Sequence, residues 1–499
     1  MNKILLLLLF SAVLNAQPHI DVVYPRAMPP DTIAYIDDVN ENFIFGSVTP
    51  PNSVLRINGI KVELLENGSF LAFLPVDWEN SYYELTATAV TSLSIDSANF
   101  YWQSNVIVRK DSSSIILPFT TRSIKGKAEQ PDISFPTLVT LNGGVARTAP
   151  NGAYYLFPDK DTQVIATGWR DNYYRFRIAP QQSVWVASYY CSKFEAQSDI
   201  LPPVIWEAQA EQKQGWDELK VPLGRKVLYR IYDETFPNKI IVDLFGVISH
   251  LDKISYSSDL RSVWDIVWSQ PADEVVRLEI NLMHSCWGYK VDWSEDGQFI
   301  LSVKNPPEIL WGIKGLHVAI DPGHGGDKDG AIGPTRLTEK EINLKIAGSV
   351  VELLESKGVQ VTQTRTDDSD IGLKKRIHLA ENAGADLLIS LHHNALADGT
   401  NPFGDFGTGT HYYHPFSRDF AISVQRELIQ ALMLHDEGVY YNNLALARPT
   451  AMPSILVESA YIMFPDHEMM MLSEDYPAKI AKAIYLGVKE FVTLRKKSL

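Results

Sequence analysis

The sequence predicts a multidomain protein in which several β-rich modules precede a C-terminal α/β domain. The chain has 499 residues, too many for one ordinary hydrophobic core, and 45% of them are hydrophobic. Short strand patterns and turn signals dominate residues 17–303, whereas strands alternate with helical patterns after residue 314. Asn305-Pro306-Pro307 lies between these two regions and is typical of a linker.

Residues 1–16 are predicted to form a signal peptide. Lys3 precedes an apolar run from Ile4 to Leu14, and Ala16 offers a small residue for cleavage. The run is short for a membrane span and no second long apolar segment follows, so we expect no stable span after cleavage. We therefore expect an exported protein in the periplasm, with a secreted or wall-associated location as the alternative.

The first β-rich module is predicted at residues 17–108. Asn58-Gly59 and Asn67-Gly68 are strong hairpin signals, and apolar residues alternate beside them, as in Leu55 and Ile57. This pattern resembles an immunoglobulin-like sandwich.

A second module is predicted at residues 113–195, where Tyr173 to Ile178 and Ser183 to Val186 have strand patterns resembling an SH3-like barrel. A third β-rich module is predicted at residues 203–303. It has alternating apolar positions from Val275 to Met283 and a hairpin signal at Asp296-Gly297.

Charge and cysteine content restrict the partners of the chain. The formal net charge of -15 argues against nucleic acid as a partner. Cys191 and Cys286 both precede the predicted α/β domain. In an oxidising compartment they could pair, but two buried free thiols are an equal alternative.

The C-terminal region, residues 314–499, places polar side chains after three predicted buried strands. His324 lies just beyond the first strand, His392 ends the second and Glu458 ends the third. The strands are Leu316 to Ile320, Leu387 to Leu391 and Ile455 to Val457. Because the carboxyl ends of strands in an open α/β sheet form its ligand crevice, we expect these side chains to converge.

Glu339 comes from the start of a predicted helix. Thr338 and Glu341 match a capping box, and apolar residues follow at helical spacing up to Gly358. The predicted helices are Lys340 to Ser356, Ser417 to Leu434 and Pro477 to Thr493.

Two histidines and one glutamate, with a position left open for water, satisfy the requirements of a catalytic zinc ion. His392 and His393 are adjacent on extended backbone, so only one of them easily faces the metal. Glu458 is costly beside buried strand residues unless it is paired or functional.

Several motifs from about Lys314 to the end resemble those of the zinc-dependent N-acetylmuramoyl-L-alanine amidases, which cut bacterial peptidoglycan. The matching segments are Ala319 to Gly326, Gly330 to Gly333, Glu339 to Leu344, Thr364-Arg365, Arg376, Ala380 to Asn382, Ala385 to Asn394 and Met452 to Glu458.

This resemblance implies roles for individual residues. His324, Glu339 and His392 would be the zinc ligands, and Glu458 the general base that handles the protons of the attacking water. Arg448 and Asn394 also occupy family-like positions, where they would bind substrate carboxylates or the developing oxyanion; a surface arginine and a plain turn residue are the alternatives. The implied reaction is hydrolysis of the amide bond between the lactyl group of N-acetylmuramic acid and L-alanine.

The resemblance also bears on partners. Peptidoglycan is the expected partner, and residues 203–303 resemble localisation modules that precede the catalytic domain in some amidases. The segment from Asn394 to Met452 has little space for the long inhibitory helix of some relatives, so we expect activity without an activator protein. Two alternatives stay open: a zinc peptidase or amidase acting on another bond of the stem peptide, and a non-catalytic cell-wall-binding protein.

Overall fold

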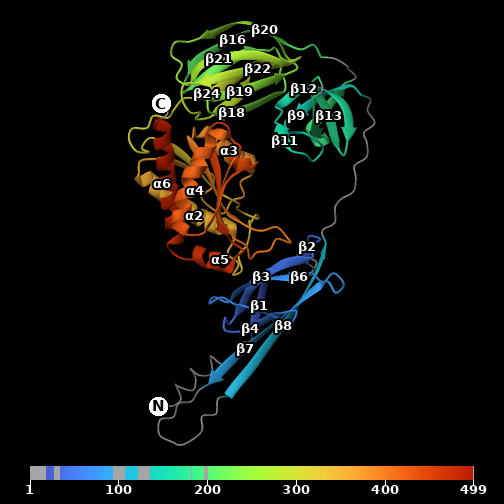
Figure 1. Ribbon diagram of the computed structural model, residues 1–499, viewed down its shortest axis with the longest axis vertical. Helices are drawn as coiled ribbons and strands as arrows, with labels where there is room; N and C mark the ends of the chain where they lie inside the picture. The colour runs from blue at the N-terminus through green and yellow to red at the C-terminus, as the bar shows by residue number, and fades with distance from the viewer. Residues whose placement is uncertain are drawn as a thin grey trace, which may run out of the picture.

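The computed structural model describes residues 18–26, 34–93, 107–121, 135–180, 182–195 and 200–497. Three β-rich units and one α/β domain follow one another along the chain (Figure 1). This order confirms the predicted sequence of β-rich modules and α/β domain. The predicted signal peptide lies outside the described residues. Among the described helices, none is long and apolar enough to cross a membrane.

The first unit has two sheets around one apolar core, with strand orders β1-β3-β6 and β2-β8-β7-β4-β5. The predicted hairpin at Asn58-Gly59 joins β4 to β5, and both residues have positive φ angles. The predicted boundary at residue 108 is wrong, because β8 crosses it and pairs along β7 from Ile107 to Pro118. The strands are β1 His19–Tyr24, β2 Ala34–Ile36, β3 Glu41–Thr49, β4 Val54–Ile57, β5 Ile60–Val62, β6 Ser69–Pro75, β7 Tyr82–Leu93 and β8 Ile107–Thr121.

The second unit is a single sheet of order β11-β10-β14-β13-β12-β9-β15 around a core that includes Val139, Phe176 and Val186. It begins at β9, so the start predicted at residue 113 is also wrong. Its elements are β9 Thr137–Asn142, β10 Ala146–Arg147, β11 Tyr154–Leu156, β12 Lys160–Arg170, β13 Tyr173–Ala179, β14 Gln182–Ala187, η1 Ser188–Tyr190 and β15 Cys191–Glu195.

The third unit packs a sheet of order β20-β16-β17-β24-β23 on one of order β18-β19-β22-β21. Cys286 is buried here and Cys191 lies in the second unit; both are free thiols, so no disulfide joins them. The strands are β16 Val204–Lys213, β17 Trp216–Pro222, β18 Tyr229–Thr235, β19 Asn238–Phe245, β20 Ile248–Tyr256, β21 Val263–Ala272, β22 Val275–Leu282, β23 Tyr289–Trp293 and β24 Gln298–Lys304.

The α/β domain has a six-stranded sheet of order β26-β25-β27-β30-β28-β29. Its strands pair in parallel except β28 and β30. Helix α6 packs against both α2 and α4 over the sheet (Figure 1). The elements are β25 His317–Pro322, α2 Glu339–Ser356, β26 Gln360–Gln363, α3 Leu373–Asn382, β27 Leu387–Asn394, β28 Gly407–Tyr412, η2 Pro415–Ser417, α4 Arg418–Leu432, β29 His435–Tyr441, η3 Ala445–Ala447, β30 Ser454–Tyr461, α5 Pro465–Met471 and α6 Tyr476–Lys497.

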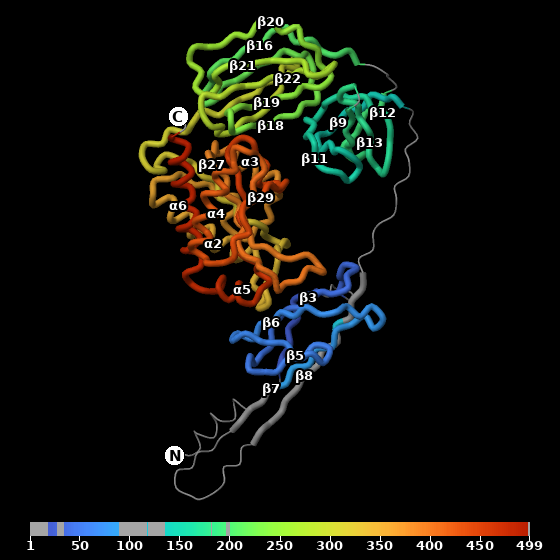
Figure 2. The backbone as a smooth tube through the Cα atoms, viewed as in Figure 1, coloured from blue at the N-terminus to red at the C-terminus, as the bar shows by residue number. Residues whose placement is uncertain are grey.

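The first and third β-rich units contact the α/β domain at opposite ends (Figure 2). The first unit packs Phe43 and Phe45 against Tyr461 and Phe464, close to α5. The third unit contacts the other end, where Lys304 Nζ lies 2.9 Å from an Asp386 carboxylate oxygen.

Candidate metal centre

A glycine-rich turn after β25 holds His324. The backbone of His324 has a φ of 62°, which is unusual for a residue with a side chain. Two buried arginines fix the turn: Arg376 donates to the His324 carbonyl at 2.6 Å, and Arg365 donates to the Gly323 carbonyl at 2.9 Å. Arg376 also pairs with buried Asp321 at 2.9 Å. These hydrogen bonds from surrounding side chains therefore hold the turn in its strained conformation.

Glu339 lies in the first turn of α2, as predicted, and is only 3% exposed. The predicted capping box is present, with the Thr338 amide donating to a Glu341 carboxylate oxygen at 3.1 Å. The side chain of Glu339 turns toward the loop, where Ala331 donates its amide to Oε2 at 2.9 Å. The helix start thus directs a buried carboxylate at His324.

His392 and His393 point to opposite faces of β27. His392 Nδ1 lies 2.8 Å from Glu339 Oε1. His393 instead forms buried hydrogen bonds with the Asn343 side chain at 2.9 Å and the Tyr476 hydroxyl at 3.0 Å. The structure therefore places His392, and not His393, in the group with Glu339.

His324, Glu339 and His392 each offer one donor atom within 4.8 Å of the others. Within the described ranges, no other group of three histidine, cysteine or acidic side chains comes this close. Burial opposes ionisation of Glu339, but hydrogen bonds from both histidines hold its pKa well below the usual range. Burial also opposes charging of His392, yet Glu339 raises the pKa of His392 to about 9. Two imidazole nitrogens and one carboxylate oxygen this close together are donors that a metal cation accepts.

Glu458 lies opposite His392 in the parallel register of β27 and β30. Its Oε2 atom is buried and has no hydrogen-bond partner among the described residues. Burial, reinforced by the charge of Glu339, raises the pKa of Glu458 to about 8. An unsatisfied buried carboxylate is costly, and such costs are concentrated at functional sites.

Asn394 and Arg448 lie in different surroundings. Asn394 is two residues beyond His392, at the carboxyl end of β27. Arg448 precedes β30 and so lies at the opposite end of the sheet, with its guanidinium over the rings of Tyr154 and Phe157 from the second unit. A substrate contact by either residue stays a prediction.

Sequence patterns predict no structural role for Arg365, Arg376 or Asn343, although these residues support the site. Arg365 and Arg376 belong to motifs of the family, but the carbonyl groups of the turn to which they donate are more than 40 residues away in the sequence.

Comparison with known proteins identifies the same region. Residues 318–490 match the family described as N-acetylmuramoyl-L-alanine amidase. YqiI of Bacillus subtilis (strain 168), whose name calls it uncharacterized, is 34% identical over 182 residues, which are 36% of this chain and 86% of YqiI. N-acetylmuramoyl-L-alanine amidase LytC of the same organism is 34% identical over 38% of this chain, but only 37% of LytC is covered.

A crystal structure of N-acetylmuramoyl-L-alanine amidase from Clostridium difficile 630 is 34% identical in sequence, with a TM-score of 0.33. The match covers 36% of this chain and 97% of the Clostridium difficile chain. The sequence match to the family and to most of YqiI lies on the domain that holds the His324, Glu339 and His392 group. The chain belongs to the N-acetylmuramoyl-L-alanine amidase family.

Proposed function

We propose that the α/β domain hydrolyses the amide bond between the lactyl group of N-acetylmuramic acid and the L-alanine of the peptidoglycan stem peptide. The unpartnered carboxylate oxygen of Glu458, buried opposite His392, is the observation that carries this proposal. Family membership supports the reaction class, and LytC is named for that same amidase activity.

The residues present fit a zinc ion. His324, Glu339 and His392 supply nitrogen and oxygen donors, which zinc accepts in catalytic sites, and three protein ligands leave a fourth position open. When bound there, zinc would make water more acidic and polarise a carbonyl group. The Ala331 amide and the Asn343 side-chain amide both donate to Glu339, at 2.9 Å and 3.4 Å, and hold its carboxylate in place for the metal.

Glu458 is proposed to move the proton. Its carboxylate accepts a proton from water as the water attacks the lactyl carbonyl, then delivers that proton to the departing alanine nitrogen. Burial raises its pKa to about 8, so both the form that accepts a proton and the form that delivers one are accessible near neutral pH. Asn394, at the end of the same strand as His392, would orient the substrate, and we keep Arg448 as a proposed contact with a distant part of it.

The remaining parts of the chain are proposed to bring this domain to the wall. Residues 1–16 would direct export to the periplasm, with secretion or wall association as alternatives. The first unit would be an immunoglobulin-like sandwich, the second an SH3-like barrel and the third a localisation module. Probable cell wall amidase LytH of Staphylococcus aureus, 30% identical over 60% of its length, supports a wall location by its name.

The rival reaction is cleavage of another amide within the stem peptide. Digestion of purified sacculi by the full chain, followed by mass analysis, separates the two. Release of whole stem peptides with a free L-alanine amine supports the proposal. Release of shortened stems, with L-alanine still attached to sugar, would overturn it. We expect activity without any added activator protein.

A further inference from the structure

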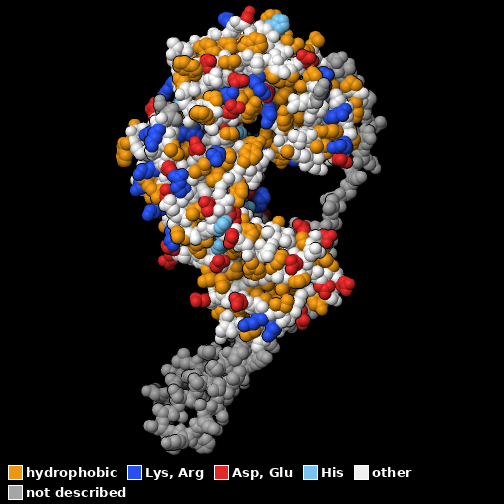
Figure 3. Space-filling model, viewed as in Figure 1, with side chains coloured by type: hydrophobic (Ala, Val, Ile, Leu, Met, Phe, Trp, Pro, Cys, Tyr) orange, Lys and Arg blue, Asp and Glu red, His pale blue; other side chains and the backbone are white. Residues whose placement is uncertain are grey.

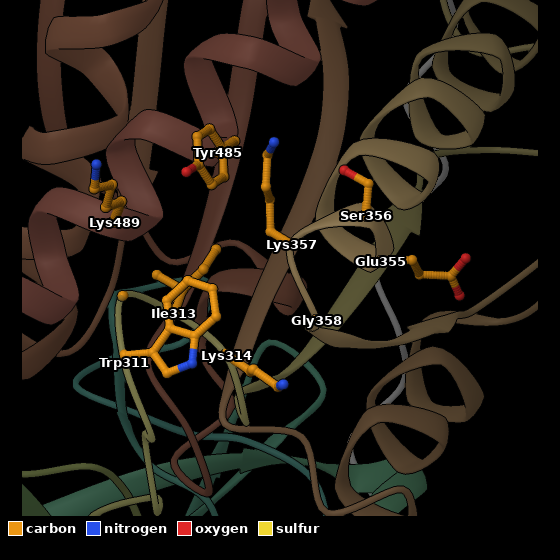
Figure 4. A pocket seen from close by; sticks show the side chains of 10 residues that line it. Trp311, Ile313, Lys314, Glu355, Ser356, Lys357, Gly358, Tyr485 and Lys489 are labelled. Atoms are coloured by element: carbon orange, nitrogen blue, oxygen red, sulfur yellow. The ribbon is translucent and has the colours of Figure 1, made fainter.

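A hollow lies on the α/β domain, away from the candidate metal centre. It has a volume of about 680 Å³ and is lined by the Trp311–Lys314 turn, the C-terminal end of α2 and one face of α6 (Figure 4). Glu339 begins α2 and Ser356 ends it. Since a helix rises ~1.5 Å per residue, the two sites lie on the order of 25 Å apart. The hollow is therefore separate from the metal centre.

Positive charge predominates in this hollow. Lys314, Lys357 and Lys489 line it, against a single acidic residue, Glu355. In the part of the chain that the structure describes, none of these lysines forms an ion pair with an acidic side chain. Figure 4 shows the Glu355 carboxylate directed away from the Tyr485 ring. Figure 3 shows Lys and Arg side chains gathered over the region of α2 and α6. In a chain of net charge -15, such a local excess attracts anions.

Two aromatic rings accompany the lysines. A tight turn, in which the Lys314 amide donates to the Trp311 carbonyl at 3.0 Å, leaves Trp311 69% exposed. Lys314 Nζ lies 5.8 Å from the centre of that ring, and Lys357 Nζ lies 5.6 Å from the centre of the Tyr485 ring. Flat apolar faces beside ammonium groups suit a ligand with a ring to stack and an anionic group to pair.

We propose that this hollow binds a sugar that bears a carboxylate, namely the muramic acid residue of a glycan strand whose stem peptide has been removed. The inference rests on the proposed function. Hydrolysis adds the hydroxyl of water to the lactyl carbonyl and its hydrogen to the alanine nitrogen. The product strand thus carries a lactyl carboxylate where the substrate strand carries a neutral amide, and the hollow holds the enzyme on strands that it has already processed.

The lysines could alternatively serve only the fold. Lys357 caps α2, and cations near a helix C-terminus stabilise the helix. Lys345, exposed in the middle of α2 and outside the hollow, is a matched control for the loss of one positive charge from the same helix.

The test measures binding of soluble, stem-free glycan strands to the full chain carrying Glu458→Gln, a change that prevents hydrolysis of the amide-bearing strands used in the second arm. Adding Lys314→Ala and Lys357→Ala, or Trp311→Ala alone, should weaken binding about tenfold or more, because charge-assisted hydrogen bonds or a stacking face are lost. Adding Lys345→Ala should change binding by less than about twofold. Melting temperatures show whether each variant is folded, and Trp311→Ala, which changes an exposed side chain, keeps the test valid if the double lysine variant unfolds.

A second arm uses strands whose lactyl carboxylates have been converted to neutral amides. Weaker binding to these strands, with no further loss in the lysine variants, supports the proposal. Equal binding of both kinds of strand, or equal binding by all variants, would overturn it. The binding result is independent of catalysis. Failure of the wild type to release stem peptides would refute the proposed function, whereas equal binding in these experiments would refute the hollow as a glycan site.

Discussion

His392 and Glu458 face each other on neighbouring parallel strands, β27 and β30. The ladder of main-chain hydrogen bonds therefore sets their separation, and no flexible loop intervenes. His324 follows the strand on the other side of β27, and Glu339 enters from the helix that crosses behind it. The carboxyl edge of the sheet thus brings together residues from four distant parts of the sequence.

The two adjacent histidines should differ in their effects. His392→Ala is expected to abolish stoichiometric zinc binding, because it removes a proposed ligand. His393→Ala should keep zinc but lower the free energy of unfolding by about 1–3 kcal/mol, since Asn343 and Tyr476 each lose one buried hydrogen bond. Metal analysis and urea unfolding test both statements. Zinc loss in His393→Ala but not in His392→Ala would contradict the assignment.

Gly330 should be essential for the metal centre although it offers no ligand. A Cβ atom there would lie 2.4 Å from Glu339 Oε2 and 2.8 Å from His324, and its φ of 74° also disfavours a side chain. Gly330→Ala is therefore expected to weaken zinc affinity about 10-fold or more, which is the usual effect of losing a hydrogen bond that orients a metal ligand.

Gly348→Ala is the matched control for that change. It lies in α2 with open space around its Cα, so alanine should leave zinc affinity unchanged and stabilise the helix by up to ~1 kcal/mol. Equal zinc affinity in the two variants, measured by competition with a chelator, would show that the close approach at Gly330 does not matter.

The contact between the third unit and the α/β domain should respond to pH through Asp233 and His414. Asp233 Oδ1 lies 3.7 Å from His414 Nδ1, and burial raises the pKa of Asp233 to about 7 and lowers that of His414 to about 4. Between about pH 4 and 7 the folded state holds the extra proton on Asp233, so this residue makes stability fall as pH rises. Between about pH 4 and 6.5 the unfolded state holds the extra proton on His414, so this residue makes stability rise.

The two effects oppose each other in the wild type, and single substitutions should separate them. Compared with the wild type, the slope of stability against pH over this interval should become more positive in Asp233→Asn and more negative in His414→Gln. Thermal unfolding measured from pH 4 to 7 checks the signs. Changes of slope in the same direction in both variants would contradict this account.

Asp398 should anchor the first unit. It accepts hydrogen bonds from the Tyr24 hydroxyl and from the Asp37 amide, the latter at 2.7 Å. Asp398→Ala should therefore speed hydrogen exchange of the Asp37 amide and raise the radius of gyration measured by X-ray scattering. Asp405→Ala, an exposed change in the same loop, should do neither. Unchanged exchange in both variants would show that the apolar contact alone holds the unit.

The sequence predicted best those elements whose signals are local. Buried apolar runs marked β25, β27 and β30, and the capping box marked the start of α2. β28 was missed because its buried positions are polar: Thr408 and Thr410 bond to the Ser459 carbonyl and to Gln425. The end of the first unit was misplaced because β8 passes through a run of charged and hydroxyl residues that only its pairing with β7 identifies as strand.

Among the site residues, those with motif spacing could be predicted and those defined by distant partners could not. The family resemblance already selected His392 as the ligand, but the buried role of His393 depends on Tyr476, which is 83 residues away. The surroundings of Arg448 depend on how the second unit docks, and no local pattern encodes that.

The measurement that tests the central claim most directly is release of stem peptides from purified sacculi by the wild type and by Glu458→Gln, with zinc content determined in both. Glutamine keeps the size of the side chain but cannot accept a proton. The account predicts equal zinc content, intact stem peptides from the wild type, and a rate lower by about 10²–10⁴-fold in the variant. Wild-type rates in Glu458→Gln at full zinc content would contradict the assigned role of Glu458, and with it the proposed site.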